Sequence, residues 1–195
     1  ELKLHGHESK DFQGASMYHY DDFGLINGHR VMYGKSEMAS SWTGAAGDTV
    51  RKAISDINPR LVVCVGIAWG AKETEQQIGD VLIAQEVQIG ANAKIGPSSN
   101  KFRSPSEGVS QEAAATFKRS AQKSGIRFHA GKIISKEDLF DNKTQRNRAV
   151  KAATGCIGGE MEAAGALKAL IDARAENDRH YELAVVKAIC DWGYK

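Results

Sequence analysis

Proline, cysteine and long hydrophobic runs are scarce in this sequence, and neither sign of charge dominates it. Three prolines stand against twenty glycines among 195 residues, which favours tight turns and close backbone approaches within a compact sheet protein. The longest apolar stretch, residues 61–68, is far too short to cross a bilayer. Lysines and arginines number 26 against 24 acidic residues, so a net charge of +2 provides no basic field for nucleic acid or a membrane surface. We therefore expect a soluble globular protein that binds neither nucleic acid nor a membrane.

The cysteines are too few for a disulfide framework. Cys64, Cys156 and Cys190 cannot all pair, and no two of them have the Cys-x-x-Cys spacing. Cys64 and Cys190 lie in apolar, strand-like runs, where a thiol behaves as a small hydrophobic group. We interpret the three as buried, reduced cysteines of a cytoplasmic protein, in preference to a redox or metal role. The histidines are scattered and no carboxylate cluster has ligand spacing, so we expect no metal and no cofactor.

Apolar runs that follow amphipathic stretches indicate the fold class. Residues 61–68 and 182–190 are nearly continuous apolar runs, as expected for strands buried on both faces of a sheet. An amphipathic helix is predicted before each of them, over residues 48–56 and 161–175. A helix followed by a buried strand, repeated along the chain, indicates α/β layers. The composition is 42% hydrophobic and 26% charged and no linker divides the chain, so residues 1–195 are predicted to be a single domain.

The rest of the sequence divides into shorter elements with local signals. Asn27-Gly28 marks the turn of an antiparallel hairpin, whose strands we expect over residues 15–20 and 25–32. Gly125 stands where a helix over residues 111–123 needs a left-handed cap. Further elements are predicted as strands over residues 80–84, 86–89 and 127–134, a polar loop over 96–108 and a short helix over 142–152.

Three segments contain residues that could carry chemistry, and each also has a purely structural explanation. The glycine-rich turn Gly66–Gly70 follows a strand, where a backbone can approach a ligand closely, but it lacks the known phosphate-binding patterns. Glu160 and Glu162 stand at the mouth of an apolar helix, where carboxylates also serve as simple dipole partners. Asp191 ends a buried strand, at the edge where α/β sheets bind ligands, and it could donate a proton there or only cap a loop.

Taken in order, these segments resemble the successive motifs of the purine nucleoside phosphorylase and uridine phosphorylase superfamily. The closer branch is similar to the methylthioadenosine/S-adenosylhomocysteine nucleosidases, and the resemblance covers most of the chain from about Leu25. It implies a three-layer α/β/α sandwich with a mixed, twisted central sheet. The family's first strand would precede Glu1 and its last helix would follow Lys195, so we expect a domain that is incomplete at both ends. The matching segments are Gly66–Gly70, Ile78–Ala84, Ser135–Asn142, Gly159–Glu162 and Ala188–Asp191.

The resemblance implies that the chain cleaves the N-glycosidic bond of a purine nucleoside or nucleotide through an oxocarbenium-like state. Asp191 would be the catalytic residue, because a proton donated to N7 of the purine lets the base leave as a neutral molecule. Glu162 would accept both ribose hydroxyls in charge-assisted hydrogen bonds. Met161 would pack beneath the sugar, and Glu160 would lie beside it.

Four further positions in the resemblance concern the base and the bond that breaks. Phe140 would stack on the base, next to Leu139. Ala68 and Trp69 would lie where the loop approaches the glycosidic bond. The family has glycine at the position of Trp69, so the size of the pocket and the identity of the substrate stay open.

The attacking group and the setting of the domain follow only by analogy. No arginine lies between Gly66 and Gly70 to hold an anion, which favours hydrolysis; a phosphorylase would instead use inorganic phosphate as co-substrate. We expect a homo-oligomer, and an effector domain fused to other domains of a sensor or defence protein. The alternative is a non-catalytic module that binds a purine nucleoside without cleaving it.

Overall fold

The computed structural model describes residues 3–4, 6–90, 93–95, 100–102, 106–137 and 142–194. The helices within these ranges are α1 (Ala46–Ile57), α2 (Gln111–Lys123), α3 (Lys143–Ala152) and α4 (Ala163–Asn177). The strands are β1 (Lys3–Leu4), β2 (His7–Glu8), β3 (Lys10–Gln13), β4 (His19–Ile26), β5 (His29–Tyr33), β6 (Leu61–Gly70), β7 (Val81–Ile89), β8 (Ala93–Ile95), β9 (Asn100–Phe102), β10 (Ser106–Gly108), β11 (Phe128–Ser135), β12 (Cys156–Glu160) and β13 (Glu182–Asp191).

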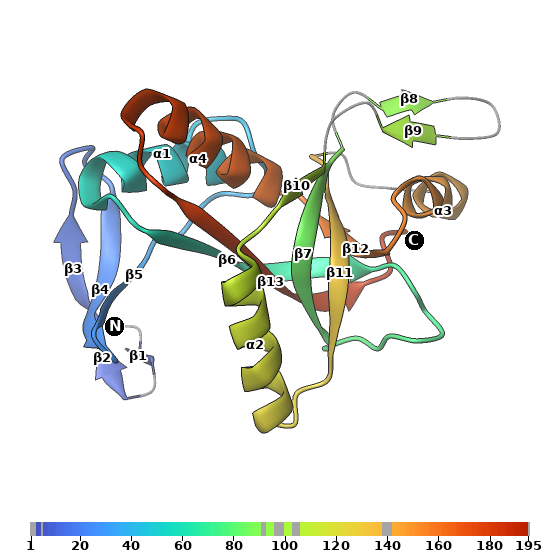
Figure 1. The fold of residues 1–195 in the computed structure, drawn as a ribbon, viewed down its shortest axis with the longest axis horizontal. Coiled ribbons are helices and arrows are strands. Elements are labelled where there is room, and N and C mark those ends of the chain that lie inside the picture. Colours follow the sequence, from blue (N-terminus) through green and yellow to red (C-terminus); the bar gives the residue numbers. More distant parts are fainter. Residues whose placement is uncertain are drawn as a thin grey trace.

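A mixed sheet with the strand order β10-β7-β11-β12-β6-β13 forms the centre of the fold (Figure 1). β11 runs parallel to β7 and β12, and β13 runs parallel to β6, whereas β12 is antiparallel to β6. β13 also pairs with β7 in antiparallel register, from Val186 opposite Ile83 to Ala188 opposite Val81, so the sheet closes on itself. α1 and α4 pack together on one side, and α2 contacts the strands from another. The mixed α/β fold expected from the sequence is confirmed.

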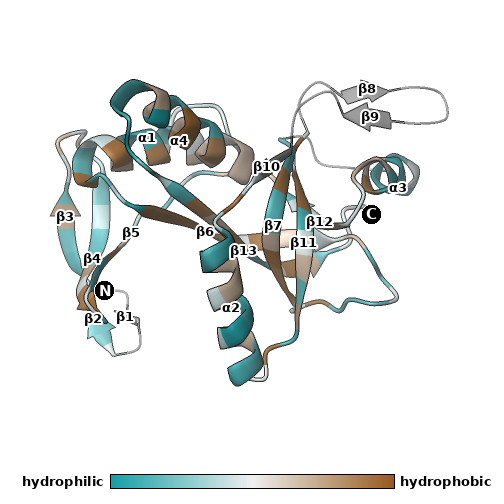
Figure 2. Ribbon diagram, viewed as in Figure 1, coloured by the Kyte–Doolittle hydropathy of each residue, from teal (hydrophilic) through white to brown (hydrophobic). Residues whose placement is uncertain are grey.

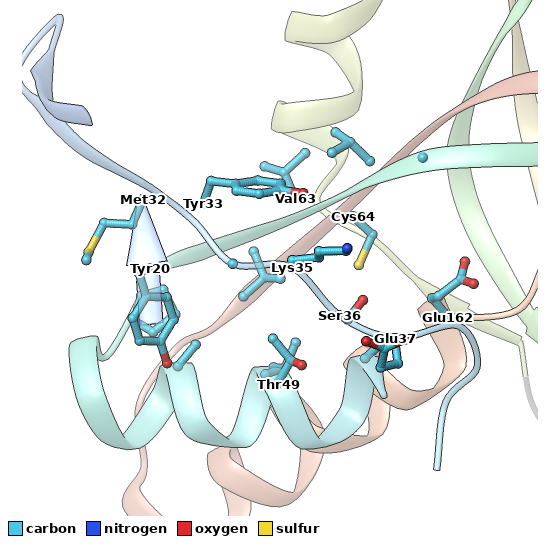
Figure 3. A pocket seen from close by; sticks show the side chains of 18 of the residues that line it. Tyr20, Met32, Tyr33, Lys35, Ser36, Glu37, Thr49, Val63, Cys64 and Glu162 are labelled. Atoms are coloured by element: carbon cyan, nitrogen blue, oxygen red, sulfur yellow. The ribbon is translucent and has the colours of Figure 1, made fainter. Parts of the chain in front are cut away.

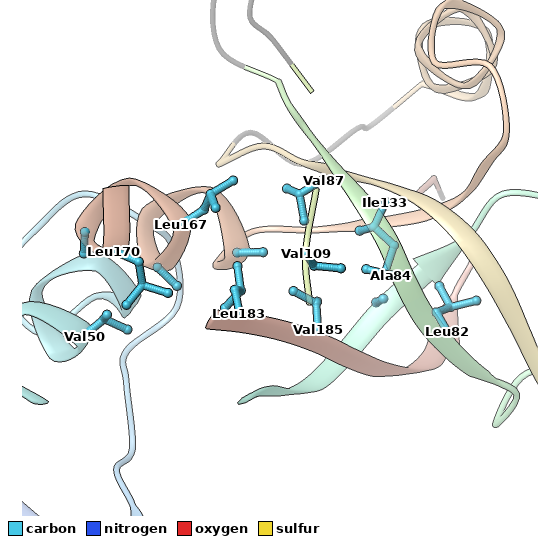
Figure 4. Close-up of a cluster of buried hydrophobic side chains, with 14 of the residues drawn as sticks. Val50, Leu82, Ala84, Val87, Val109, Ile133, Leu167, Leu170, Leu183 and Val185 are labelled. Carbon is cyan, nitrogen blue, oxygen red and sulfur yellow. The ribbon is translucent and has the colours of Figure 1, made fainter. Parts of the chain in front are cut away.

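The main hydrophobic core lies between α4 and the strands β7 and β13 (Figure 4). α4 presents Ala166, Leu167 and Leu170 at helical spacing, each at most 2% exposed. Leu183 and Val185 of β13 meet this face of the helix. Figure 2 shows the same division, with hydrophobic residues along β6, β7 and β13 and hydrophilic residues along much of α2.

The prediction that the strand after residue 61 is buried on both faces is wrong. Val62 and Cys64 pack against the core, but Val65 is 60% exposed and Ile67 is 64% exposed on the opposite face of β6. α2 contacts mainly β7, β11 and β13, and residues 61–67 of β6 pair with β13 alone among the described strands. An apolar run predicts a strand, but both faces of that strand are buried only where other elements pack on each side of it.

Most local predictions agree with the structure, with small shifts of boundary. α2 has the predicted bounds, and Gly125 follows it with a left-handed φ of +66°. Asn27 and Gly28 form the hairpin turn with φ of 51° and 80°, but the first strand of the hairpin begins only at His19. The two strands predicted between residues 80 and 89 are one continuous strand, β7.

Candidate functional site

The turn from β12 into α4 holds two carboxylates in different surroundings. The side chain of Glu160 is fully buried, and its carboxylate accepts hydrogen bonds from the backbone N–H of Glu162 at 3.0 Å and of Ala163 at 2.9 Å. These donors belong to the start of α4, where N–H groups lack partners within the helix and favour a negative charge. Glu162, by contrast, is 21% exposed. Glu160 therefore stabilises the turn, and Glu162 is the carboxylate that a ligand can reach.

A buried lysine that the sequence analysis missed joins the two carboxylates. Lys187 Nζ lies 2.8 Å from Glu162 Oε2 and 3.3 Å from Glu160 Oε2, and its side chain is 3% exposed. It stands opposite Gly66 in the β6–β13 ladder. Gly66 has φ +154°, and a Cβ there would lie 3.3 Å from the lysine nitrogen, so glycine leaves room for the ammonium. The signal in the sequence was a lone lysine within the apolar run 182–190, since an unpaired buried lysine is rare.

The pKa values of this cluster show how the charges balance. Burial works to lower the pKa of Lys187, but the charge of Glu160 and the hydrogen bond to Glu162 outweigh it, so the pKa is raised. Burial raises the pKa of Glu160, and the Lys187 ammonium opposes that effect. The lysine therefore stays charged at neutral pH, and its charge holds the Glu162 carboxylate in place.

Glu162 and Lys187 line a cavity of about 540 Å³. Figure 3 shows this cavity with Glu162 in its wall. The wall is completed by residues 32–38, one side of α1 and residues 61–67 of β6. Within the described ranges β5 pairs only with β4, and residues 61–67 of β6 pair only with β13. The cavity is thus bordered by two strand edges, and Glu162 lies at the end far from Tyr20 in Figure 3.

The other predicted site residues that the structure describes lie outside the wall of this cavity. Ala68 is buried in the core, and Trp69 packs against a second apolar cluster that includes Ile134. Met161 follows Glu160, and its carbonyl accepts a 2.7 Å hydrogen bond from Ser40 Oγ. Trp69 therefore does not narrow the space beside Glu162, although the resemblance leads us to expect glycine in its place.

Asp191 lies at the exposed end of β13, opposite Trp69 in the ladder. Its carboxylate accepts a 2.7 Å hydrogen bond from the backbone N–H of Gly193 and a 3.1 Å bond from Cys190 Sγ. It follows Lys187 by four residues on the same strand. Leu139 and Phe140, predicted to contact the base, lie outside the described residues.

The prediction that all three cysteines are buried is wrong for Cys190, which is exposed. Cys156 is buried and Cys64 is partly buried, and all three are free thiols. Desolvation raises the pKa of Cys64 to about 12, and of Cys156 and Cys190 to about 11. The three therefore remain protonated near neutral pH, where a nucleophilic or metal-binding cysteine would need to ionise.

Metal binding and membrane insertion each require a feature that the described residues lack. No group of three or more His, Cys, Asp or Glu side chains in this part of the chain is placed to hold a metal ion. None of the described helices has the length and apolar character that a membrane crossing requires.

Gly158 and Gly159, which precede Glu160, pack so closely against Trp69 that a larger residue does not fit at either position. A Cβ at Gly159 would overlap the Trp69 indole and lie 2.7 Å from the carbonyl oxygen of Ile134. We expect Gly159→Ala to lower the free energy of unfolding by about 1–3 kcal/mol, the usual effect of overpacking. Gly108→Ala is the control, because a Cβ there meets nothing within 4 Å. Urea denaturation of both variants measures the difference, and equal stabilities would contradict the packing argument.

Comparisons with known proteins identify the family and the fold of this chain. Residues 23–172 match the family model described as the phosphorylase superfamily. A curated relative, a death domain-containing ATP nucleosidase from Amphimedon queenslandica, is 23% identical over 204 residues. The match covers 91% of this chain and 36% of the relative, so the chain spans about a third of that protein's length.

Solved structures show the same fold. The 5′-methylthioadenosine/S-adenosylhomocysteine nucleosidase of Neisseria meningitidis, in complex with methylthio-immucillin-A, has a TM-score of 0.76 at 16% identity, covering 95% of this chain and 78% of that one. A mutant of the Helicobacter pylori nucleosidase with 5′-methylthioadenosine in its active site has a TM-score of 0.76 at 15% identity, covering 97% and 78%. At these identities the likeness is one of fold.

Proposed function

The chain belongs to the phosphorylase superfamily, and from this premise we propose that it hydrolyses the N-glycosidic bond of a purine nucleoside or nucleotide. The observation that carries the proposal is the Glu162–Lys187 pair at the wall of the cavity. A carboxylate held by a buried ammonium is suited to accept the two hydroxyls of a ribose. The fold shared with nucleosidases that bind purine analogues supports the same reaction class.

The sugar end of the site is proposed to stabilise positive charge. Cleavage of the bond leaves an oxocarbenium-like ribosyl group, and the nearby Glu162 carboxylate favours that charge. Lys187 Nζ donates a hydrogen bond to Glu162 Oε2, and this bond fixes the Glu162 side chain before the substrate binds. Met161 remains our candidate for the contact beneath the sugar. Glu160 is proposed to hold Lys187 in position without contacting the substrate, because its carboxylate is buried away from solvent.

The base end of the site is proposed to supply a proton. Asp191 is the candidate donor to N7 of the purine, so that the base leaves as a neutral molecule. Phe140 and Leu139 are proposed to contact the base. For Ala68 and Trp69 we propose backbone contacts near the glycosidic bond, because their side chains pack into the interior.

The charges of the cavity favour water over phosphate as the attacking group. Its charged lining residues are Lys35, Glu37, Glu162 and Lys187, and no arginine is among the lining residues in the described part of the chain. Glu160 adds a further carboxylate beside Lys187. With these charges the cavity does not attract a phosphate dianion, and it offers no arginine guanidinium to bind two phosphate oxygens at once. The binding of a neutral water molecule does not depend on this charge balance.

The name of the curated relative suggests a substrate and a setting. That protein is named an ATP nucleosidase with a death domain, which supports a purine nucleotide as substrate and a fusion to other domains here. The strand edges of β5 and β6 that border the cavity fit an additional strand, which the family resemblance leads us to expect from a longer polypeptide. We also propose a homo-oligomer and a cytoplasmic location.

Product analysis of the longest natural form of the protein tests this function. The protein is incubated with adenosine, 5′-methylthioadenosine, AMP and ATP, each with and without inorganic phosphate. Free base and a free ribosyl product that form without phosphate support hydrolysis. A strict need for phosphate, with a ribose-1-phosphate product, identifies a phosphorylase. Tight binding without release of base favours the non-catalytic module.

Glu162→Ala should weaken ribonucleoside binding, because the two ribose hydroxyls lose their charged acceptor. The expected loss is on the order of 1.5–3 kcal/mol for the charged hydrogen bonds. A 2′-deoxynucleoside makes one of these bonds fewer, so the preference for ribose over 2′-deoxyribose should shrink. Glu176→Ala, at an exposed position in the last turn of α4, is the control. Calorimetric titration with both sugars measures the effect, and an unchanged preference would mean that Glu162 only supports the helix.

A further inference from the structure

Arg146 of α3 is a buried cation that the proposed mechanism does not use. The residue is 3% exposed, and burial lowers the pKa of its guanidinium. Its Nε donates to the carbonyl of Trp192 at 3.1 Å, one terminal nitrogen donates to the carbonyl of Gly70, and the other donates to Asn147 at 2.8 Å. Among the described residues its hydrogen bonds to other elements thus go to backbone carbonyls.

The two carbonyls belong to the ends of two neighbouring strands. Gly70 is the last residue of β6, and Trp192 directly follows Asp191, the last residue of β13. The β6–β13 ladder shifts its register between Ile189 and Asp191, so the regular pairing is interrupted just before the proposed proton donor. Within the described residues, the Asp191 carboxylate accepts hydrogen bonds from its sequence neighbours Cys190 and Gly193. Arg146 therefore gives this segment a fixed connection to another part of the molecule.

Two aromatic rings lie close to the guanidinium of Arg146. Its central carbon lies 5.5 Å from the centroid of the Trp69 ring and 5.7 Å from that of Tyr194. Arginine suits this place because its planar fork bridges two carbonyls and stacks on aromatic faces, whereas a lysine offers a single point of charge. Trp69 thus serves as a support for Arg146, where the family resemblance leads us to expect glycine.

We propose that Arg146 is a positioning residue that holds Asp191 at the site of proton transfer through the carbonyl of Trp192. The inference rests on the proposed function and extends it to α3. Without Arg146 the segment after Ile189 keeps its ladder position opposite Trp69 and the hydrogen bond from Cys190 Sγ to the Ala68 carbonyl, but the Trp192 carbonyl loses this donor. Asp191 then samples positions from which it cannot reach the base. A displacement of about 1 Å can lower a rate by about 100-fold.

Kinetics of base release test this inference. We expect Arg146→Gln to lower kcat by about 10–100-fold while KM changes less than about threefold, because Glu162 and Lys187 are untouched. Arg146→Lys should recover only part of the loss. Arg148→Gln, two residues further on the same helix, is the matched control and should leave kcat unchanged. If Arg146 acts through Asp191, the double variant with Asp191→Asn should be no slower than Asp191→Asn alone. Additive losses, or a loss that falls on KM, would overturn the proposal.

Amide hydrogen exchange separates failure of this inference from failure of the proposed function. In Arg146→Gln we expect exchange at the Gly193 amide, which donates to Asp191, to rise at least about tenfold. The amides of residues 183–188 should keep their wild-type rates. If the wild-type protein releases no base, the proposed function is refuted, but the structural link between Arg146 and the Asp191 segment is not. Unchanged exchange at Gly193, or faster exchange along the whole of β13, overturns the inference whether or not base is released.

Discussion

Asp191→Asn is expected to lower the rate of base release by roughly 10²–10⁴-fold, the usual effect of losing a general acid. Asparagine keeps the shape of the side chain and can still donate a weak hydrogen bond, but it cannot deliver a proton to N7. Without that proton the purine must leave as an anion, and the barrier rises. Nucleoside affinity should stay within a few-fold, because the sugar contacts are made elsewhere.

Two measurements on the same preparations check this expectation. Release of free base gives the turnover, and calorimetric titration with a slowly cleaved nucleoside gives the affinity. Asp172→Asn is the control, since this aspartate pairs with Lys168 on the surface of α4. Wild-type turnover in Asp191→Asn would rule out the proposed proton donor. A loss of affinity as large as the loss of turnover would place Asp191 among the residues that only bind.

Lys187→Met should destabilise the fold by about 3–5 kcal/mol, because it leaves the buried Glu160 and its neighbour Glu162 without their common counter-charge. Methionine has a similar length, so little of the loss comes from packing. Lys168→Met removes an exposed ion pair with Asp172 and should cost at most about 1 kcal/mol. Denaturant unfolding of both variants gives the comparison. A loss in Lys187→Met no larger than in the control would contradict a structural role for the cluster.

The pH dependence of this loss has a definite sign. Burial raises the pKa of Glu160, and without Lys187 nothing nearby opposes that effect as strongly. A group with a raised folded pKa contributes most stability below its unfolded pKa, about 4.3 for glutamate, and loses that contribution as the pH rises through the folded value. The deficit of Lys187→Met should therefore be smaller at acidic pH than at pH 8. Glu160→Gln added to Lys187→Met should recover part of the stability at pH 8, and no recovery would place the loss outside the charge cluster.

The sequence alone was sufficient for the family, the mixed α/β fold and most element boundaries. The element boundaries depend on interactions between residues that are close in the sequence. Ser110 caps α2 by accepting from the N–H of Ala113, and Asn142 caps α3 by accepting from Thr144 and Gln145. The order of the motifs along the chain indicated the superfamily, which the family match confirms. The roles of Asp191 and Glu162 stay predictions.

The tertiary structure alone decided which charged groups meet and which apolar faces stay open. Glu160 and Lys187 are 27 positions apart in the sequence, and they meet only because β12 and β13 both flank β6. Arg146 reaches Gly70 and Trp192 for a similar reason, since α3 packs beside the ends of two strands. Hydrophobic periodicity shows which residues share a face of β6, but only the tertiary structure shows that Val65 and Ile67 stay exposed on their face. Contacts between elements distant in sequence depend on how the helices and strands pack together, and local sequence patterns do not specify that packing.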